Sequence, residues 1–257
     1  MPEYTDHHAP EGLRTRGTVI VVPGRGETRA AYTRFGRRLA ADAYRVRVID
    51  PPDIDGNDLA DSLTRFGDRL AAAAEDSATG GGGAVRPLVL VGADRGAVAL
   101  AALLGRDGVP PAARPDAVVL AGIPGAGATA AGGRWEDELD VRTSCPAHRG
   151  TLTEDAGVRR GALGEEVPRA LLTAARDSAP DVPALLLVGD ADPLADREAL
   201  VRTAQSLPRA RLSVVRGGHH DVLNDLQHRS VAAEIVTFLE ALREGLVPVV
   251  TVGSSAW

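Results

Sequence analysis

The sequence predicts an α/β protein with a mostly parallel central sheet, flanking helices and a small helical cap. Short apolar runs alternate with longer segments of helical periodicity, which is typical of parallel strands joined by right-handed crossovers. This alternation is interrupted at residues 123–182, where Gly, Pro and charged residues replace the strong apolar runs. Ligands bind at the carboxyl edge of such sheets, so an insert after a strand is predicted to cover a site there.

The predicted strands are continuous apolar runs or alternate with period two, as buried strands do. Residues 18–22 read TVIVV, and Val alternates with Arg in residues 44–49. The remaining strands are PLVLV at 87–91, DAVVLA at 116–121, PALLLV at 183–188 and ARLSVV at 210–215.

The predicted helices lie between these strands and repeat apolar residues every three or four positions. In the second of them, Leu59, Leu63, Phe66 and Leu70 share one face. In chain order the helices are expected at 28–43, 58–75, 95–104, 195–206 and 222–243.

A chain of 257 residues is long enough for one large domain with a generous core. The predicted parts are an N-terminal arm without regular structure at 1–16, a core at 17–122 and 183–244, the cap at 123–182 and a C-terminal tail at 245–257. The tail is apolar without a clear period. It is expected to pack either on the body or on another subunit of a homo-oligomer.

The composition argues against several classes of partner and location. The net charge is -6, and every basic residue is Arg, so a nucleic-acid surface is not expected. Cys145 is the single cysteine, which excludes an internal disulfide and fits a reducing cytoplasm. The N-terminus has no apolar signal segment, and no run approaches the length of a membrane span. A cytoplasmic protein that acts on a small molecule is therefore expected.

Three loops that follow predicted strands carry the residues that are candidates for catalysis. Residues 92–96 read GADRG, the spacing of a nucleophile elbow with Asp94 where serine usually stands. Residues 189–193 read GDADP, and residues 217–221 read GGHHD. The order nucleophile, acid, histidine is that of α/β-hydrolases, and all three loops are expected at one edge of the sheet.

From about Gly17 to Arg243 the chain resembles the α/β-hydrolase family. The sequence PGRGE at 23–27 resembles the H-G-x-G-E oxyanion loop of the monoacylglycerol lipase and lysophospholipase branch, with Pro replacing His. The resemblance implies that the main-chain N–H groups of Arg25 and Arg95 form the oxyanion hole, beside a substrate contact at Gly24. The two arginine side chains are expected to be solvated or ion-paired at the surface, and the alternative is that they bind an anionic substrate.

Residues 218–224 resemble the histidine loop of the same branch, in which the catalytic histidine directly precedes an acid. This implies that His220, rather than His219, is catalytic. In G-D-x-D loops of the family the second acid orients the histidine, which implies Asp192 rather than Asp190. The D-R-G at 94–96 departs from the branch and resembles haloacetate dehalogenases and some epoxide hydrolases.

A carboxylate at the elbow suits attack on an sp³ carbon. Asp94 is already ionised, since its reference pKa is about 3.9, and the following helix N-terminus favours its charge. Attack on an ester would give a reactive anhydride, whereas attack on a carbon bearing halide or epoxide oxygen gives an ordinary ester. His220, oriented by Asp192, would then activate water to hydrolyse that ester. The hypothesis is a hydrolase with epoxide hydrolase- or dehalogenase-like chemistry.

Departures from these families leave other functions open. The tyrosines are Tyr4, Tyr32 and Tyr44, so the cap lacks the acid that commonly opens epoxides. Haloacetate dehalogenases carry a second arginine where this chain has Val98. The alternatives are an esterase, lactonase or lipase-like enzyme, a cyclase or lyase using Asp94 and His220 for proton transfer, and a small-molecule-binding relative without turnover.

The cap offers Trp135, His148 and Arg149 as further candidates for substrate binding. The segment CPAHR at 145–149 is expected either to reach into the site or to form a capped turn held by ion pairs. No cofactor is expected, because the dinucleotide fingerprint fails at Arg29. No metal is expected, because the sequence near His219 and His220 lacks a second cluster at ligand spacing.

Overall fold

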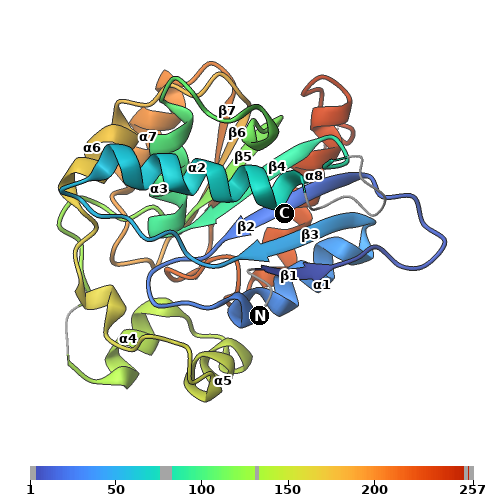
Figure 1. Ribbon diagram of the computed structural model, residues 1–257. Coiled ribbons are helices and arrows are strands. Elements are labelled where there is room, and N and C mark those ends of the chain that lie inside the picture. The colour runs from blue at the N-terminus through green and yellow to red at the C-terminus, as the bar shows by residue number, and fades with distance from the viewer. Residues whose placement is uncertain (1–3, 76–82, 131–132, 252–253, 255–257) are drawn as a thin grey trace.

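A seven-stranded sheet in the order β1-β3-β2-β4-β5-β6-β7 forms the centre of this computed structural model, which describes residues 4–75, 83–130, 133–251 and 254 (Figure 1). Strand β1 is antiparallel to β3, and the other pairs are parallel. The predicted mostly parallel sheet is therefore confirmed. The strands are β1 (Tyr4–His7), β2 (Gly17–Val22), β3 (Tyr44–Ile49), β4 (Leu88–Ala93), β5 (Ala117–Ala121), β6 (Ala184–Gly189) and β7 (Ala210–Val215).

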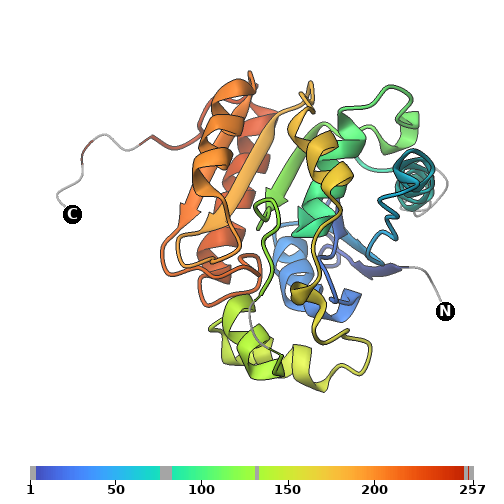
Figure 2. The same ribbon diagram turned by 90° about the vertical axis from the view of Figure 1, so that its left-hand side faces the viewer.

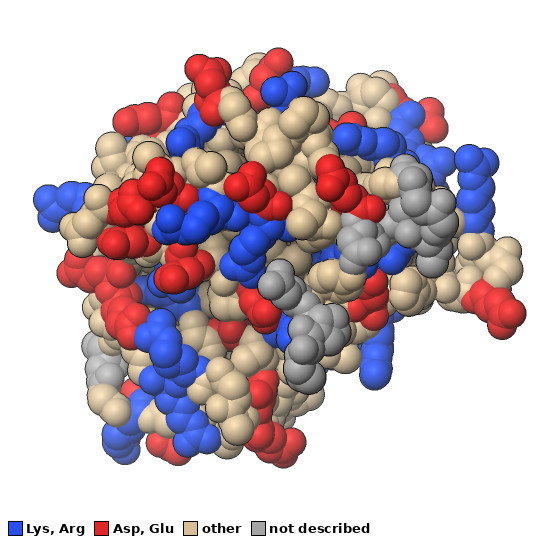
Figure 3. All heavy atoms as spheres, viewed as in Figure 1, with Lys and Arg blue, Asp and Glu red and all other residues tan. Residues whose placement is uncertain are grey.

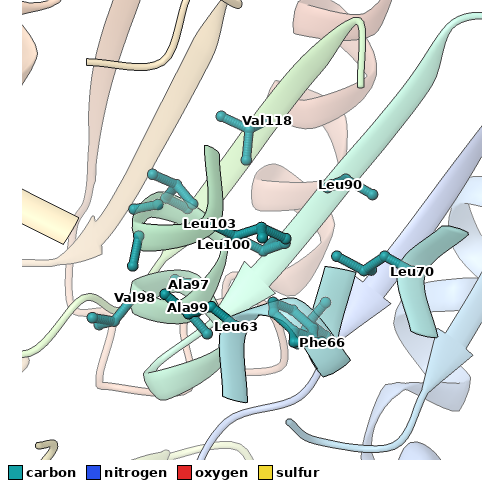
Figure 4. Close-up of a cluster of buried hydrophobic side chains, with 14 of the residues drawn as sticks. Leu63, Phe66, Leu70, Leu90, Ala97, Val98, Ala99, Leu100, Leu103 and Val118 are labelled. Carbon is teal, nitrogen blue, oxygen red and sulfur yellow. The ribbon is translucent and has the colours of Figure 1, made fainter. Parts of the chain in front are cut away.

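Successive side chains of the central strands enter two separate apolar clusters, as the two-residue period of a strand requires. In β2, Ile20 joins the cluster on one face and Val21 the cluster on the other. The first cluster contains Leu63, Phe66 and Leu100 (Figure 4). Because helices cover both faces, the central strands β4, β5 and β6 are apolar throughout, whereas β3 alternates Val with Arg.

The helices divide between the two faces of the sheet. Buried side chains of α2, α3, α6 and α7 belong to one cluster, and those of α1 and α8 to the other. The bounds are α1 (Thr33–Ala41), α2 (Leu59–Glu75), α3 (Arg95–Leu104), α4 (Trp135–Arg142), α5 (Pro146–Glu154), α6 (Arg169–Arg176), α7 (Arg197–Ser206) and α8 (His228–Arg243), with 3-10 helices at Arg29–Tyr32, Pro111–Ala113 and Ala162–Gly164.

The predicted N-terminal arm is not without structure, because its residues Tyr4–His7 form the edge strand β1. Asp6 on this strand accepts hydrogen bonds from Arg47 Nε and Nη2, both at 2.7 Å. The Arg47 guanidinium also lies 3.5 Å from the centre of the Tyr4 ring. Cross-strand charge and cation–π contacts thus hold a segment that has too few apolar residues to be recognised as a strand.

The last helix begins later than predicted, at His228 rather than residue 222. The intervening residues form turns, and the Asp225 carboxylate accepts hydrogen bonds from Thr143 Oγ1 and from the His219 main-chain N–H. An acid that satisfies donors outside its own helix favours a turn over helix continuation. Val222 and Leu223 are buried in the core, which explains their helix-like apolar pattern.

Helices α4 and α5 lie beyond the carboxyl ends of the strands, apart from the sheet layers (Figure 2). The predicted insert at 123–182 also includes α6, whose Leu171 and Leu172 join the cluster on the α3 face of the sheet, whereas Leu139 of α4 and Leu152 of α5 join the cluster on the opposite face. The part of the insert that lies beyond the strand ends centres on α4 and α5. These helices are positioned to cover the three loops that carry the candidate residues.

In the described part of the predicted tail, Leu246 is partly buried against the core, whereas Val249 and Val250 are 62% and 80% exposed. Residues 252–253 and 255–257 of the tail lie outside the described residues. Across the described segments, no helix is long and apolar enough to cross a membrane. On the face shown in Figure 3, basic and acidic side chains are interspersed.

Candidate active site

The turn between β4 and α3 holds Asp94 in a left-handed conformation, with φ 46° and ψ -122°. Such a backbone is costly for a residue with a side chain and points to a functional turn. The neighbouring glycines allow it, because a Cβ on Gly96 would lie 2.5 Å from the Pro23 carbonyl oxygen. A Cβ on Gly92 would similarly lie 2.6 Å from the Ala97 Cα. Residues 92–96 therefore have the tight geometry that the elbow motif predicts.

The structure brings Asp94, His220 and Asp192 together from three strand ends. His220 Nε2 lies 3.2 Å from Asp94 Oδ1, and its Nδ1 lies 2.9 Å from Asp192 Oδ2. Asp192 is fixed in turn by the Leu194 main-chain N–H, which donates to Oδ1 at 2.8 Å. The three side chains thus form one connected line, in which the histidine lies between two carboxylates.

The residues that sequence reasoning set aside lie elsewhere. Asp190 accepts a hydrogen bond from the Gly217 main-chain N–H at 2.6 Å, and His219 Nδ1 lies 2.9 Å from Asp225 Oδ2. The acid and histidine loops are packed closely. A Cβ on Gly189 would lie only 1.9 Å from the Gly218 carbonyl oxygen. This close approach of the acid loop to the histidine loop places Asp192 beside His220.

The Arg25 side chain is buried rather than exposed at the surface, which corrects the expectation from the sequence. Its Nη2 donates to Asp94 Oδ1 at 2.9 Å and its Nε to Oδ2 at 2.9 Å. The Arg25 main-chain N–H also donates to Asp94 Oδ2, at 2.7 Å. An elbow carboxylate attracts a guanidinium strongly, whereas a serine would not, and the fork of Arg matches a carboxylate in bidentate geometry.

These contacts set the protonation states of the site. Burial alone raises the pKa of Asp94, but contact with His220 and the charge of Arg25 outweigh it and hold that pKa well below its usual value. Burial alone lowers the pKa of His220, but the charge and hydrogen bonding of Asp192, followed by those of Asp94, raise it to about 10. At neutral pH the site therefore holds an ionised Asp94 beside a protonated His220.

The second predicted oxyanion donor, Arg95, is the first residue of α3. Its main-chain N–H is thus among the helix N-terminal donors that lack an intrahelical partner. Its side-chain Nη2 lies 3.5 Å from the Pro52 carbonyl oxygen. Gly24 lies on the opposite side of the elbow, where a Cβ would approach the Asp94 Cβ to 2.9 Å.

The cap residues predicted to bind substrate contact other groups in this structure. Trp135 Nε1 donates to Thr153 Oγ1 at 3.0 Å, and Arg149 Nη1 donates to Asp140 Oδ1 at 2.7 Å. His148 is buried, and its Nε2 lies 2.9 Å from Asp221 Oδ2. The segment at 145–149 thus begins helix α5 and is held by ion pairs, and its contact with substrate stays a prediction.

Sequence reasoning missed the buried polar residues that join the cap to the catalytic loops. Arg142, at the end of α4, donates to Glu138 Oε1 at 2.8 Å and to the Arg25 carbonyl oxygen at 2.7 Å. Its Nη1 also donates to Asp221 Oδ1 at 3.4 Å. Glu27 and Asp221 stood in the two quoted loop motifs, but nothing in the pattern around Arg142 indicated burial.

An apolar cavity of about 60 Å³ lies between α3, α6 and α7. Val98 lines it, at the position where haloacetate dehalogenases carry a second arginine, together with Leu120 and Leu172. The lining is mostly apolar but also includes Arg176 and Asp196, and Val98 itself offers no charge to hold a substrate carboxylate.

Comparison with known proteins finds similarity in structure only. No protein-family model matches the sequence, and no curated protein matches it significantly. Among solved structures, it resembles a monoglyceride lipase from Saccharomyces cerevisiae, with TM-score 0.68, 14% identity and coverage of 93% of this chain and 91% of that one.

Two further structures resemble it over nearly their whole length. A monoacylglycerol lipase from Paleococcus ferrophilus has TM-score 0.67 and 19% identity, covering 93% of this chain and 98% of that one. A type II thioesterase of the yersiniabactin pathway has TM-score 0.53 and 21% identity, covering 94% and 99%. With the parallel sheet, the elbow after β4 and the acid and histidine loops after β6 and β7, these similarities show that the chain has the α/β-hydrolase fold.

Proposed function

We propose that this protein is a hydrolase in which Asp94 is the nucleophile and the pair His220 and Asp192 activates water. The observation that carries the proposal is the connected line of three side chains, with His220 Nε2 3.2 Å from Asp94 Oδ1 and Nδ1 2.9 Å from Asp192 Oδ2. A nucleophile, a base and a group that orients the base are the parts that covalent catalysis requires. The substrate is a small organic molecule with an epoxide or carbon–halogen bond.

In the first step an Asp94 oxygen attacks an sp³ carbon. A carbon–oxygen ester bond forms, and the halide or epoxide oxygen leaves with the electron pair of the broken bond. Esterification removes the negative charge of Asp94, one of the groups that raise the pKa of His220. The pKa of His220 therefore falls, and the imidazolium gives up its proton to solvent or to the leaving oxygen.

In the second step neutral His220 accepts a proton from water as that water attacks the ester carbonyl. The tetrahedral oxyanion develops on an Asp94 oxygen. The Arg25 main-chain N–H, which donates to Asp94 Oδ2 at 2.7 Å in this structure, is placed to stabilise it. Collapse of the intermediate releases the alcohol and restores the Asp94 carboxylate.

Attack requires the Arg25 side chain to move away from Asp94. Arg25 Nε lies 3.1 Å from Oδ1 and 2.9 Å from Oδ2, so its guanidinium covers both carboxylate oxygens. A carboxylate has about four lone-pair sites, and here the main-chain N–H and the guanidinium of Arg25 donate to both oxygens, with His220 Nε2 3.2 Å from Oδ1. In this proposal the arrangement is a resting state, and the substrate must displace the Arg25 guanidinium before Asp94 can attack.

The test is the trapping of the covalent ester. The variant His220→Gln is incubated with a panel of epoxides, haloacids, short esters and lactones, and the intact mass is measured. We expect an adduct on Asp94 located by peptide mapping, and none in Asp94→Asn. In wild-type enzyme, repeated turnover in ¹⁸O-water should label the Asp94 carboxylate. An active enzyme that acquires neither adduct nor label would refute the covalent route.

An esterase or lipase-like activity is the second candidate, because the similar structures include lipases and a thioesterase by their titles. In that case Asp94 acts as a base or stands in for a serine, and the loop at 23–27 supplies the oxyanion hole. Gain of hydrolysis of short esters by Asp94→Ser, with no adduct in His220→Gln, would favour this candidate.

Binding without turnover is favoured by one observation, the complete engagement of the Asp94 carboxylate by Arg25 and His220. Calorimetric titration of the same panel distinguishes this case. Tight binding of a compound that is neither consumed nor attached to the protein would identify a small-molecule-binding relative.

A further inference from the structure

Glu27, His148 and Asp221 form a buried cluster beneath the cap, apart from the line of Asp94, His220 and Asp192. Glu27 lies in the loop after β2, His148 in α5, and Asp221 directly after His220. One potential ligand atom from each lies within 4.8 Å of the other two. Three segments distant in sequence thus present two carboxylates and an imidazole to one point.

The two oxygens of Glu27 are in different situations. Oε2 accepts hydrogen bonds from the Gly24 main-chain N–H at 2.8 Å and from the Tyr32 hydroxyl. Oε1 has no hydrogen-bond partner among the described residues, although the Glu27 side chain is only 2% exposed. It points toward His148 Nε2, at 4.0 Å. A buried carboxylate oxygen without a donor is costly, and it indicates a missing partner.

The charges around this oxygen do not balance. The carboxylates of Glu27, Glu138 and Asp221 are all buried here, and they face one guanidinium, that of Arg142. Three buried acidic side chains thus share one cationic partner. One divalent cation would neutralise the cluster, with His148 as a neutral ligand.

We propose that this cluster is a Zn²⁺ site, with Glu27 Oε1, His148 Nε2 and Asp221 Oδ2 as ligands. Ligand atoms about 2.0 Å from zinc in tetrahedral geometry lie about 3.3 Å apart. In this structure His148 Nε2 lies 2.9 Å from Asp221 Oδ2 and 4.0 Å from Glu27 Oε1, which brackets that value. The three ligand atoms all lie within 4.8 Å of one another, so side-chain rotations would bring them to zinc-binding distance, and a water molecule would take the fourth position.

The surrounding hydrogen bonds have the form of an outer shell for a metal. Tyr32 and the Gly24 N–H hold the second oxygen of Glu27, and Arg142 holds the second oxygen of Asp221. Such partners orient ligands and tune a metal site. Because the ligands come from the oxyanion loop, the cap and the histidine loop, zinc would join these three segments. The site does not depend on the reaction proposed for Asp94.

The first test measures zinc binding by the whole chain after treatment with a chelator. Competition with a chromophoric chelator and metal analysis after dialysis should give one Zn²⁺ per chain, with a raised melting temperature. Glu27→Gln and His148→Gln should each weaken binding at least about 100-fold, since loss of an outer-shell partner alone costs 10–100-fold. Far-UV circular dichroism checks that both variants are folded.

The matched control is His219→Gln. His219 is nearby, and its side chain is 25% exposed and pairs with Asp225 rather than with the cluster. This variant should bind zinc like the wild type. The double variant His7→Gln/His8→Gln, in the N-terminal segment, controls for adventitious binding and should also leave affinity unchanged. Loss of binding in either control, with binding retained in Glu27→Gln and His148→Gln, would overturn the proposal.

A measurement on the unaltered protein removes dependence on the folding of any variant. X-ray absorption of the zinc-loaded chain should show one imidazole nitrogen among oxygen donors at about 2.0 Å. Two or more imidazoles per zinc, or failure to bind zinc stoichiometrically, would exclude this site.

Discussion

At the scale of single residues, the replacement of an elbow serine by Asp94 changes the residues around it. The carboxylate draws the Arg25 guanidinium into the site, where it contacts both oxygens. It also makes His220 a cation held between Asp94 and Asp192. One substitution of residue type at the elbow thus implies a different resting charge state from that of a serine hydrolase.

Removal of the Arg25 side chain should expose the nucleophile. In Arg25→Ala the main-chain N–H remains, but the charge-assisted hydrogen bonds that occupy Asp94 are lost. Such bonds are worth about 1.5–3 kcal/mol each, so we expect ester formation in a His220→Gln background to accelerate at least about tenfold. The control is Arg29→Gln at the start of the following 3-10 helix, where Arg29 pairs with Asp50. An unchanged rate of adduct formation in Arg25→Ala would show that the guanidinium does not block attack.

The protonation of His220 should depend on the charge of Asp94. The pKa of His220 is raised to about 10, and its stabilising contribution is therefore present below the ordinary value of 6.5 and lost as pH rises through about 10. In Asp94→Asn one of the two carboxylates is gone, so the pKa of His220 should fall by at least about one unit. NMR titration of the imidazole measures this directly. Urea unfolding at pH values from 6.5 to about 10 should show that the free energy of unfolding falls less with pH in Asp94→Asn than in the wild type.

An equal His220 pKa in wild type and Asp94→Asn would contradict the charge state described for the resting site. His219→Gln serves as a control in the same titration, since His219 pairs with Asp225.

At the scale of elements, the cap is connected to the catalytic loops through α4. The main-chain N–H of His220 donates to the Val141 carbonyl at 3.2 Å, and that of Asp221 to the Arg142 carbonyl at 2.8 Å. The Arg142 side chain reaches the Arg25 carbonyl at 2.7 Å. The end of one cap helix therefore fixes both the histidine loop and the oxyanion loop.

Substitution of Arg142 should be strongly destabilising. Arg142→Met removes the cation that faces buried Glu138 and Asp221, and removal of one partner of a buried ion pair costs about 3–5 kcal/mol. The exposed pair of Arg149 with Asp140 gives the control, because Arg149→Gln should change stability by no more than about 1 kcal/mol. Denaturant unfolding of both variants at neutral pH is the measurement. Similar stability of the two would mean that the cap is not anchored through Arg142.

At the scale of the whole molecule, one parallel sheet brings distant loops to a common edge, while its antiparallel edge strand depends on charge. The strand β1 pairs with β3 through Tyr4 to His7. Asp6 is its main polar anchor, with both oxygens bound by Arg47. Burial alone raises the pKa of Asp6, but Arg47 outweighs it and the pKa lies below its ordinary value.

Loss of this anchor should release the edge strand locally. In Asp6→Ala we expect faster amide hydrogen exchange in residues 4–7 and in the paired residues of β3, with global stability reduced by about 1–3 kcal/mol. Glu11→Gln, at an exposed position in the following loop, is the matched control. Exchange that stays as slow in Asp6→Ala as in the control would show that backbone pairing alone holds β1.

The sequence by itself determined the central sheet and the meeting of Asp94, Asp192 and His220. Short continuous apolar runs rich in β-branched residues favour buried strands, and parallel strands place their carboxyl ends at one edge whatever the packing details. Glycine spacing likewise predicts the elbow, because the steric demand is local.

Only the tertiary structure decided where the arginines lie. Nothing in the sequence pattern distinguishes Arg25 and Arg142 from ordinary surface arginines. They are buried because carboxylates from distant loops meet them in three dimensions, and an ion pair compensates the cost of desolvation only when both partners are present. The same reason accounts for β1, which is held by Arg47 across the sheet, and for the cluster of Glu27, His148 and Asp221 beneath the cap.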